Sequence, residues 1–165
     1  MQINIIAAVP RNRVIGRNGS LPWSLPKDWN YFLNTVKGHV SIMGKTCFDE
    51  FAAGPAYPAI VVSRTLVEAG KTPPHTSLAC SYEEALDIAR NQGVNEVWIL
   101  GGQRIYTEAL ASADKLYITR IDAEYDGDTY FPEWDKHFTV CESRVEDEDN
   151  GVQLAFEVWS KSAAK

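Results

Sequence analysis

Cysteine, positive charge and long apolar runs are all scarce in this sequence of 165 residues. Three cysteines without a C-x-x-C spacing indicate neither a disulfide framework nor a zinc site, so we expect reduced thiols and no bound metal. No apolar run approaches the roughly 18 residues that a membrane helix needs. The basic residues near the N-terminus follow its apolar run, which is the reverse of a signal peptide. We therefore expect a cytoplasmic protein without a membrane partner.

The shortage of positive charge argues against one large class of partner. A net charge of −6 disfavours a general affinity for nucleic acid, which needs many Lys and Arg side chains to displace counterions from phosphates. The charge is uneven, because residues 1–48 carry six Lys or Arg and one acid, Asp28, whereas residues 142–151 hold five acids. We expect the acidic segment to be a solvated turn, and the basic first third to serve a small anion.

Short apolar runs alternate with helical patterns along the chain, as in a parallel sheet covered on both faces. The runs that predict strands are 3–9, 39–43, 59–63, 96–100 and 115–121, and the predicted helices are 25–36, 45–51, 81–93 and 103–112. Two last runs, 136–145 and 152–160, flank the hairpin signature "DNG". We predict a single α/β domain over residues 1–165, a monomer, with a mostly parallel central sheet flanked by helices and an antiparallel C-terminal edge hairpin.

Asp28 falls inside the apolar stripe of the predicted helix 25–36, three residues after Leu25 and four before Phe32. An acid in a first turn pairs favourably with the helix dipole, and this interpretation needs no function. A carboxylate on the buried face, however, requires a partner. A pterin offers an amidine-like edge that gives such a carboxylate two parallel N–H bonds, with Phe32 and Ile6 as walls for the ring.

Five stretches of the chain together resemble the dihydrofolate reductase family. They are "INIIAAVPRNRVIGRNGSLPWSLPKDW", "SIMGKT", "IVVSRT", "VWILGGQRIY" and "LYITRIDAEYDGDTYFP", in this order over nearly the whole chain. The resemblance implies NADPH-dependent reduction of a 7,8-dihydropterin to its tetrahydro form by hydride transfer to C6. Dihydrofolate is the best single substrate, and the partner is then a small molecule.

On the substrate side, the resemblance implies four catalytic positions. Asp28 resembles the carboxylate that anchors the pterin and helps to deliver a proton to N5. Thr119 resembles the hydroxyl that bridges this carboxylate and the ring, Trp23 the residue that orders a water above the ring, and Tyr106 the ring near the hydride path. The matching substrate-binding positions are Ile6, Ala8, Leu21, Trp29, Phe32, Phe51, Tyr57 and Leu100.

On the cofactor side, Gly101 and Gly102 follow a predicted strand and precede a predicted helix, whose N-terminus can receive a pyrophosphate. The family has a cis bond between two such glycines. Cationic side chains at Lys45 and Arg64 favour NADPH over NADH, because the extra phosphate of NADPH finds charge-assisted partners. The full set that the resemblance implies is Ala8, Ile15, Gly16, Asn18, Gly44, Lys45, Thr46, Ser63, Arg64, Gly101, Gly102, Gln103, Arg104 and Ile105.

The stretch from Pro10 to Ser24 is similar to the family's mobile lid, which closes over nicotinamide and substrate. A rigid surface loop is the alternative interpretation.

The sequence departs from the family pattern at three places. Tyr57 stands where the family has an arginine that grips the substrate's glutamate tail, and a phenol cannot make that bidentate pair. Trp29 replaces a smaller aliphatic residue. "GKTCFDEF" is one residue short, so either Thr46 or Cys47 fills the phosphate-binding threonine's place.

These departures leave alternatives open. A dihydropterin with another tail, such as dihydromethanopterin, would explain Tyr57. A pyrimidine reductase of the riboflavin pathway resembles the same fold, and a noncatalytic module that binds a pterin or nucleotide is the third alternative.

Overall fold

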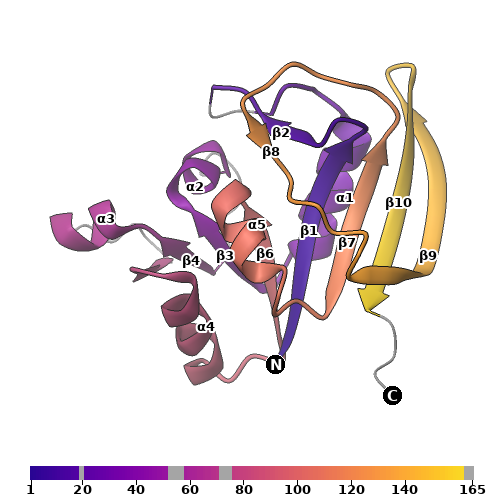
Figure 1. Ribbon diagram of the computed structural model, residues 1–165. Coiled ribbons are helices and arrows are strands. Elements are labelled where there is room, and N and C mark those ends of the chain that lie inside the picture. Colours follow the sequence, from indigo (N-terminus) through magenta and orange to yellow (C-terminus); the bar gives the residue numbers. More distant parts are fainter. Residues whose placement is uncertain (19–20, 52–57, 71–75, 162–165) are drawn as a thin grey trace.

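The computed structural model describes residues 1–18, 21–51, 58–70 and 76–161, and within them eight strands form one sheet (Figure 1). From edge to edge the strands are β5 (Thr76–Ala79), β4 (Ala59–Val62), β3 (Val40–Gly44), β6 (Glu96–Gly101), β1 (Gln2–Pro10), β7 (Lys115–Ile121), β10 (Val152–Lys161) and β9 (Phe138–Asp149). In the same residues, β2 (Val14–Gly16) and β8 (Thr129–Tyr130) form a separate antiparallel pair.

The first six strands of the sheet run parallel to one another, and β10 is paired antiparallel with both of its neighbours, β7 and β9. β1 lies between β6 and β7, with Ile5 paired to Ile99 on one side and to Leu116 on the other. β10 runs antiparallel to β7, and β9 completes the edge hairpin. The predicted α/β fold, with a mostly parallel sheet and an antiparallel C-terminal edge, is confirmed.

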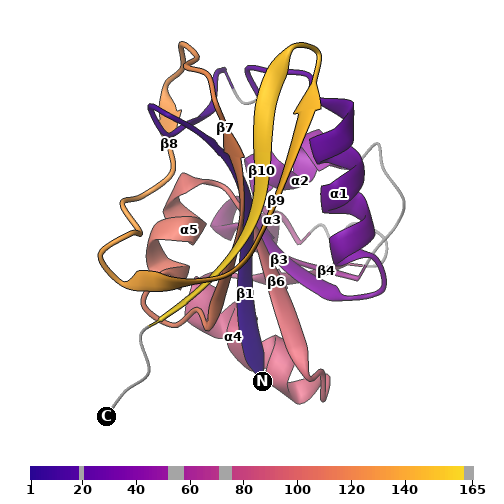
Figure 2. The ribbon, with the colours of Figure 1, turned by 90° about the vertical axis from the view of Figure 1, so that its right-hand side faces the viewer.

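Helices cover both faces of the sheet, which explains why its strands are apolar on both faces. Figure 2 shows α1 (Pro26–Val36) on one face, with α4 (Tyr82–Asn91) and α5 (Gln103–Ala109) on the other. Ile5 and Ile99 belong to the hydrophobic core under α4 and α5, whereas the next residues along each strand, Ile6 and Leu100, join the cluster that contains Val36 of α1.

All four predicted helices are present, with differences at their ends. Ser81 caps α4 by accepting a hydrogen bond from the Glu84 backbone N–H at 3.1 Å, and α4 ends at Asn91, just before Gly93. α5 ends at Ala109, three residues before the predicted position. α2 spans Lys45–Phe51 as predicted. None of the helices in the described residues has the length and apolarity that a membrane span requires.

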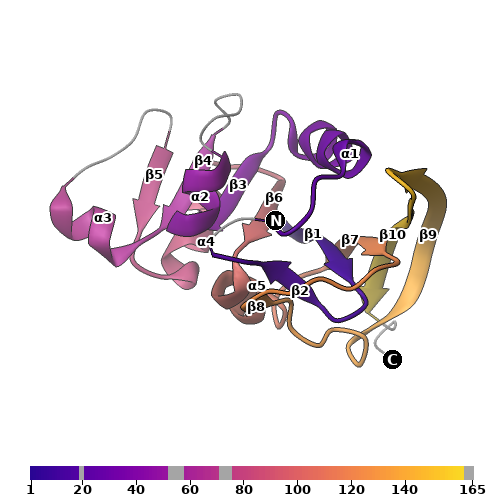
Figure 3. The same cartoon turned by 90° about the horizontal axis from the view of Figure 1, so that it is seen from above.

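Two predictions about surface segments were wrong. Most of the acidic segment 142–151 is part of strand β9 and not a turn, and the turn itself is at Asn150–Gly151. Residues 139–148 are exposed, so this edge strand carries charges where an apolar run would expose it to aggregation. The stretch from Pro10 to Ser24 is not loop throughout, because Val14–Gly16 is strand β2. Figure 3 shows β2 beside β8.

Candidate active site

A cavity of about 610 Å³ opens where the parallel strands β1, β3, β4 and β6 end. Ligands of open α/β sheets bind outside the carboxyl ends of the strands, where neighbouring chain connections diverge. The predicted residues that line it are Ile6, Ala8, Ile15, Gly16, Leu21, Asp28, Trp29, Phe32, Gly44, Lys45, Thr46, Ser63, Arg64, Leu100, Gly102, Gln103, Arg104, Ile105, Tyr106 and Thr119. The sheet thus brings both predicted sets of residues to one cavity.

Asp28 lies in the first turn of α1 and is 8% exposed. Burial raises the pKa of Asp28 from 3.8 to about 6, a hydrogen bond with Thr119 on β7 opposes the shift, and the charge of Asp149 adds to it. The neighbouring Lys27 pairs with Asp147 at 2.9 Å, and no Lys or Arg of the described chain pairs with Asp28. Asp28 is therefore a buried carboxylate whose raised pKa still lies below neutral pH, and no Lys or Arg among the described residues neutralises it.

Apolar side chains border Asp28 on the cavity side. Phe32, one turn along α1, and Ile6, near the end of β1, line the cavity together with Leu21. The rings of Trp29 and Phe32 are 5.4 Å apart, and Trp29 is 37% exposed, so the indole forms part of the rim of the cavity. A flat ring placed against Asp28 would meet an aromatic and aliphatic surface.

Trp23 lies beside the main cavity and not in it. Its ring packs against Tyr125 at 5.2 Å. Trp23 also lines a second cavity of about 360 Å³, which shares Leu21, Asp28 and Trp29 with the first. A cavity of this size holds water. Trp23 is thus placed at a second approach to the same carboxylate.

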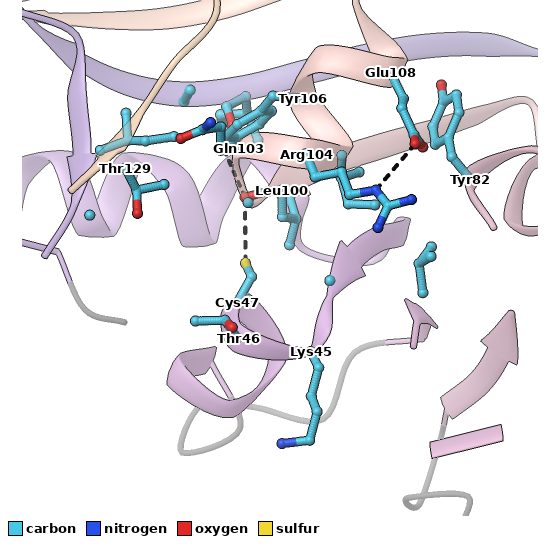
Figure 4. A pocket seen from close by; sticks show the side chains of 18 of the residues that line it. Lys45, Thr46, Cys47, Tyr82, Leu100, Gln103, Arg104, Tyr106, Glu108 and Thr129 are labelled. Atoms are coloured by element: carbon cyan, nitrogen blue, oxygen red, sulfur yellow. Dashed lines mark hydrogen bonds and ion pairs between the residues drawn. The ribbon is translucent and has the colours of Figure 1, made fainter. Parts of the chain in front are cut away.

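Tyr106 joins the ends of two neighbouring strands. Its hydroxyl lies 2.8 Å from the carbonyl oxygen of Ile6 on β1 and 2.7 Å from that of Leu100 on β6, and it can donate its hydrogen to either oxygen (Figure 4). The Cys47 Sγ lies 3.5 Å from the same Leu100 oxygen. The peptide bond between Gly101 and Gly102 is cis, as the resemblance implies. A Cβ on Gly101 would lie 2.9 Å from the Tyr106 ring, and its φ of 115° also requires glycine.

Three cations line the other end of the cavity. Lys45 pairs with Asp49 at 2.7 Å, and Arg104 with Glu108 at 3.5 Å (Figure 4). Arg64, at the start of α3 (Arg64–Ala69), has no ion-pair partner among the residues described.

Ser63 and Gln103 also have structural roles at this end. Ser63 precedes α3, and its side chain accepts a hydrogen bond from the Leu66 backbone N–H at 3.2 Å, so it caps that helix. Gln103 at the start of α5 accepts a hydrogen bond from the Tyr130 N–H at 2.8 Å, which ties α5 to β8.

The segment that resembles a lid is held by residues 125–131. The Asn18 backbone N–H donates to the Asp128 carboxylate at 3.1 Å, and the Asp128 N–H donates to the Gly16 carbonyl at 3.0 Å. The bond from the Asn18 N–H, followed by one from the Thr129 hydroxyl, lowers the pKa of Asp128. A Cβ on Gly127 would lie 2.4 Å from the Gly16 oxygen, so the two backbones touch here. Asn18 lies outside the cavity lining, and lid motion stays a prediction.

The remaining predicted residues lie beside the cavity or outside the described residues. Gly101 is buried at the end of β6, just behind the lining residue Gly102. The Phe51 side chain and Tyr57 are outside the described residues. Thr46 and Cys47 both line the cavity, which leaves open the choice between them.

Several lining residues were not predicted. They include Thr65, Cys80, Ser81, Tyr82 and Thr129. Cys80 and Ser81 follow β5, a strand that the sequence analysis did not predict. Their position at the end of a parallel strand could therefore not be recognised from the sequence. Thr129 belongs to β8, which is two residues long and leaves no periodicity to detect.

Comparison with known proteins agrees with the geometry. A family model described as dihydrofolate reductase matches residues 2–161. Dihydrofolate reductase HdrB of Haloferax volcanii is 34% identical over 166 residues, which cover 97% of this chain and 85% of the relative. The dihydrofolate reductase of Staphylococcus haemolyticus is 33% identical, covering 98% and 96%, and that of Haemophilus influenzae is 34% identical, covering 98% and 99%.

Proposed function

We propose that this chain, which belongs to the dihydrofolate reductase family and reduces dihydrofolate, uses NADPH as its cofactor. We also propose that Asp28 holds the pterin and that one domain carries both sites. The family assignment sets aside the riboflavin-pathway reductase and the noncatalytic module as alternatives. The observation that carries the site proposal is the burial of Asp28 without a protein cation.

The proposal for Asp28 follows from its charge and its surroundings. With a pKa of about 6, the carboxylate is ionised at neutral pH and accepts two N–H bonds from the amidine-like edge of a pterin. The Thr119 hydroxyl hydrogen-bonds to Asp28, which orients the carboxylate. Phe32 and Ile6 give the ring its walls, and the backbone carbonyl of Leu100 lies at the next strand end.

A nicotinamide cofactor fits the other end of the same cavity. When bound, NADPH would supply the hydride that adds to C6 of the dihydropterin. The side chains of Lys45, Arg64 and Arg104 line this end, and in this proposal the Arg64 guanidinium binds the extra phosphate that distinguishes NADPH from NADH. Tyr106 fixes the strand ends between the two sites through the carbonyls of Ile6 and Leu100.

The chain must also deliver a proton to N5 and exclude bulk water. We propose that water reaches Asp28 through the smaller cavity lined by Trp23, and that this water passes the proton to N5. The segment before Leu21 then acts as the lid, which is held by Asp128 in the state described here.

The experiment that tests the site is a comparison of Asp28→Asn with the unmodified enzyme, in which NADPH oxidation by dihydrofolate is followed by absorbance. Asn is the same size, and it removes the charge. We expect turnover to fall strongly while NADPH binding, measured by fluorescence titration, stays nearly intact. Full turnover at neutral pH would remove Asp28 from the mechanism.

We also propose that the enzyme is a monomer in the cytoplasm with a small-molecule substrate and no nucleic acid or membrane partner. Cys47, Cys80 and Cys141 form no disulfide bond, which fits a reducing compartment. Light scattering on a sizing column tests the monomer directly, since a dimer would give twice the mass.

A further inference from the structure

The acidic hairpin has no part in the proposed function, yet its tip contacts the helix that carries Asp28. The Asp149 carboxylate accepts a hydrogen bond from the Lys27 backbone N–H at 2.7 Å. The Lys27 side chain pairs with Asp147 at 2.9 Å, and the Asn150 side-chain amide donates to the Ser24 carbonyl at 3.2 Å. The partners lie 120 to 126 positions apart in the chain, so only the tertiary fold joins them.

Helix α1 has no cap from its own sequence. Leu25 at the N-cap makes no side-chain hydrogen bond, and Pro26 at the first helical position has no N–H. Asp149 fills this role from strand β9, because its oxygen accepts the N–H of the next residue, Lys27. Its negative charge also faces the positive end of the helix dipole. The turn fixed in this way contains Asp28.

The groups that face Asp28 come from three elements. Thr119 on β7 hydrogen-bonds to it, Tyr31 lies one turn further along α1, and Asp149 is the acid on β9. Lys27 is occupied by the hairpin, while β1 and β10 present apolar side chains at this point. Asp149 is therefore the one group on the packed elements, in the part of the chain described, that brings a second negative charge to Asp28.

We propose that Asp149 is a positioning residue of the pterin site: it caps α1 from the C-terminal hairpin and places a negative charge beside Asp28. A like charge disfavours ionisation of a carboxylate, as burial does, so both raise the pKa of Asp28. The hairpin thus adds to the effect of burial on the pH at which the pterin-binding group ionises. This inference rests on the proposed function, which places the pterin at Asp28.

The test uses Asp149→Asn, which keeps an oxygen for the Lys27 N–H and removes the charge. Glu148→Gln is the matched control, because it removes an equal charge from the adjacent position, where the carboxylate bonds to Gln153 of β10 and not to α1. The readout is the pKa of Asp28 in the ligand-free protein, from the pH dependence of its carboxyl ¹³C NMR signal. The signal is identified by its absence in Asp28→Asn.

We expect Asp149→Asn to lower the pKa of Asp28 by less than about one unit, because burial is the larger cause, and Glu148→Gln to lower it much less. The pH profile of kcat/KM should move in the same direction in Asp149→Asn. No shift, or equal shifts in the two variants, would overturn the proposal. Asp149→Ala also removes the cap, so its unfolding midpoint should fall below that of Asp149→Asn.

A second measurement needs no variant at the hairpin. Salt screens the charge of the partly exposed Asp149 but leaves the burial of Asp28 unchanged. The pKa of Asp28 in the unmodified protein should therefore fall as ionic strength rises. A pKa independent of salt would count against the proposal.

The two proposals fail separately. If Asp28→Asn keeps full turnover, the proposed function fails while the coupling between Asp149 and Asp28 stands. If Asp28→Asn is inactive and Asp149→Asn leaves the pKa unchanged, the present inference alone fails.

Discussion

The two ends of the cavity differ in the sign and the partners of their charges. At the cofactor end, Lys45, Arg64 and Arg104 line the wall, with Glu108 paired to one of them. At the substrate end the charged lining residue is Asp28, and the sequence has no Lys or Arg at 28–36 or 46–63. This difference supports our proposal that the enzyme recognises its cofactor through phosphates and its substrate through the ring.

The largest expected effect is the loss of the charge at the substrate end. Asp28→Asn should lower kcat by about 10²–10⁴-fold, the usual range for a group that assists proton transfer. Steady-state kinetics at neutral pH measure it. A loss of the same size in NADPH affinity would contradict this expectation, because it would show that the two ends of the cavity do not bind their ligands separately.

The same substitution lowers turnover but should raise the stability of the folded protein, relative to the unmodified enzyme, as the pH rises. Because the pKa of Asp28 is raised in the folded state, the unfolding free energy falls as pH rises from about 4 to above 6, by something of the order of 3 kcal/mol. Asp28→Asn lacks this contribution, so its stability relative to the unmodified protein should grow across that pH range. Urea unfolding at several pH values measures the difference, and a constant difference would contradict a raised pKa.

At the cofactor end, Arg64→Gln should lower kcat/KM for NADPH by about ten- to a hundredfold, the value of one charge-assisted hydrogen bond. The value for NADH should barely change. Lys45→Gln is the matched control with a smaller effect, because Lys45 is already paired with Asp49. Equal losses for both cofactors would mean that Arg64 does not read the extra phosphate.

The smallest effect concerns the substrate's tail. Position 57 has no guanidinium, Lys27 already pairs with Asp147, and Lys37 could act only as a point charge. Dihydrofolate and a dihydropterin without a glutamate tail should therefore have kcat/KM values within about tenfold of each other. A panel of dihydropterins that differ only in their tails measures this. A large preference for dihydrofolate would contradict this expectation, because it would show that other groups bind the glutamate tail in place of the arginine.

Most of the sheet could be predicted because burial on both faces leaves a plain signal. The runs around Ile5, Ile42 and Ile99 are mostly apolar, with Asn4 and Ser41 as interruptions, and each became a strand in the core. Asp28 could be found for the same reason, since an acid inside an apolar stripe breaks the pattern of its helix.

The elements that were missed carry weak or misleading patterns. β5 is the short edge strand "TSLA", and α3 has six residues whose capping residue, Ser63, was interpreted only as a cofactor contact. The first part of β9 was predicted within the run 136–145, but its acidic second part was interpreted as a turn because it is a block of like charges. Its pairing depends on β10, and charges such as Lys115 and Glu142 at 3.0 Å meet only in the fold. No local pattern records such long-range partners.

The order of the strands has a consequence for biosynthesis. β1 is made first, but its neighbour β7 and the hairpin that borders β7 are made last, and the contacts around Asp28 join opposite ends of the chain. A chain in which this hairpin has not yet formed therefore lacks the hydrogen bonds from Asp149 and Asn150 that hold the start of α1, the helix that carries Asp28. We expect a variant that lacks the hairpin to lose ligand binding rather than merely bind more weakly.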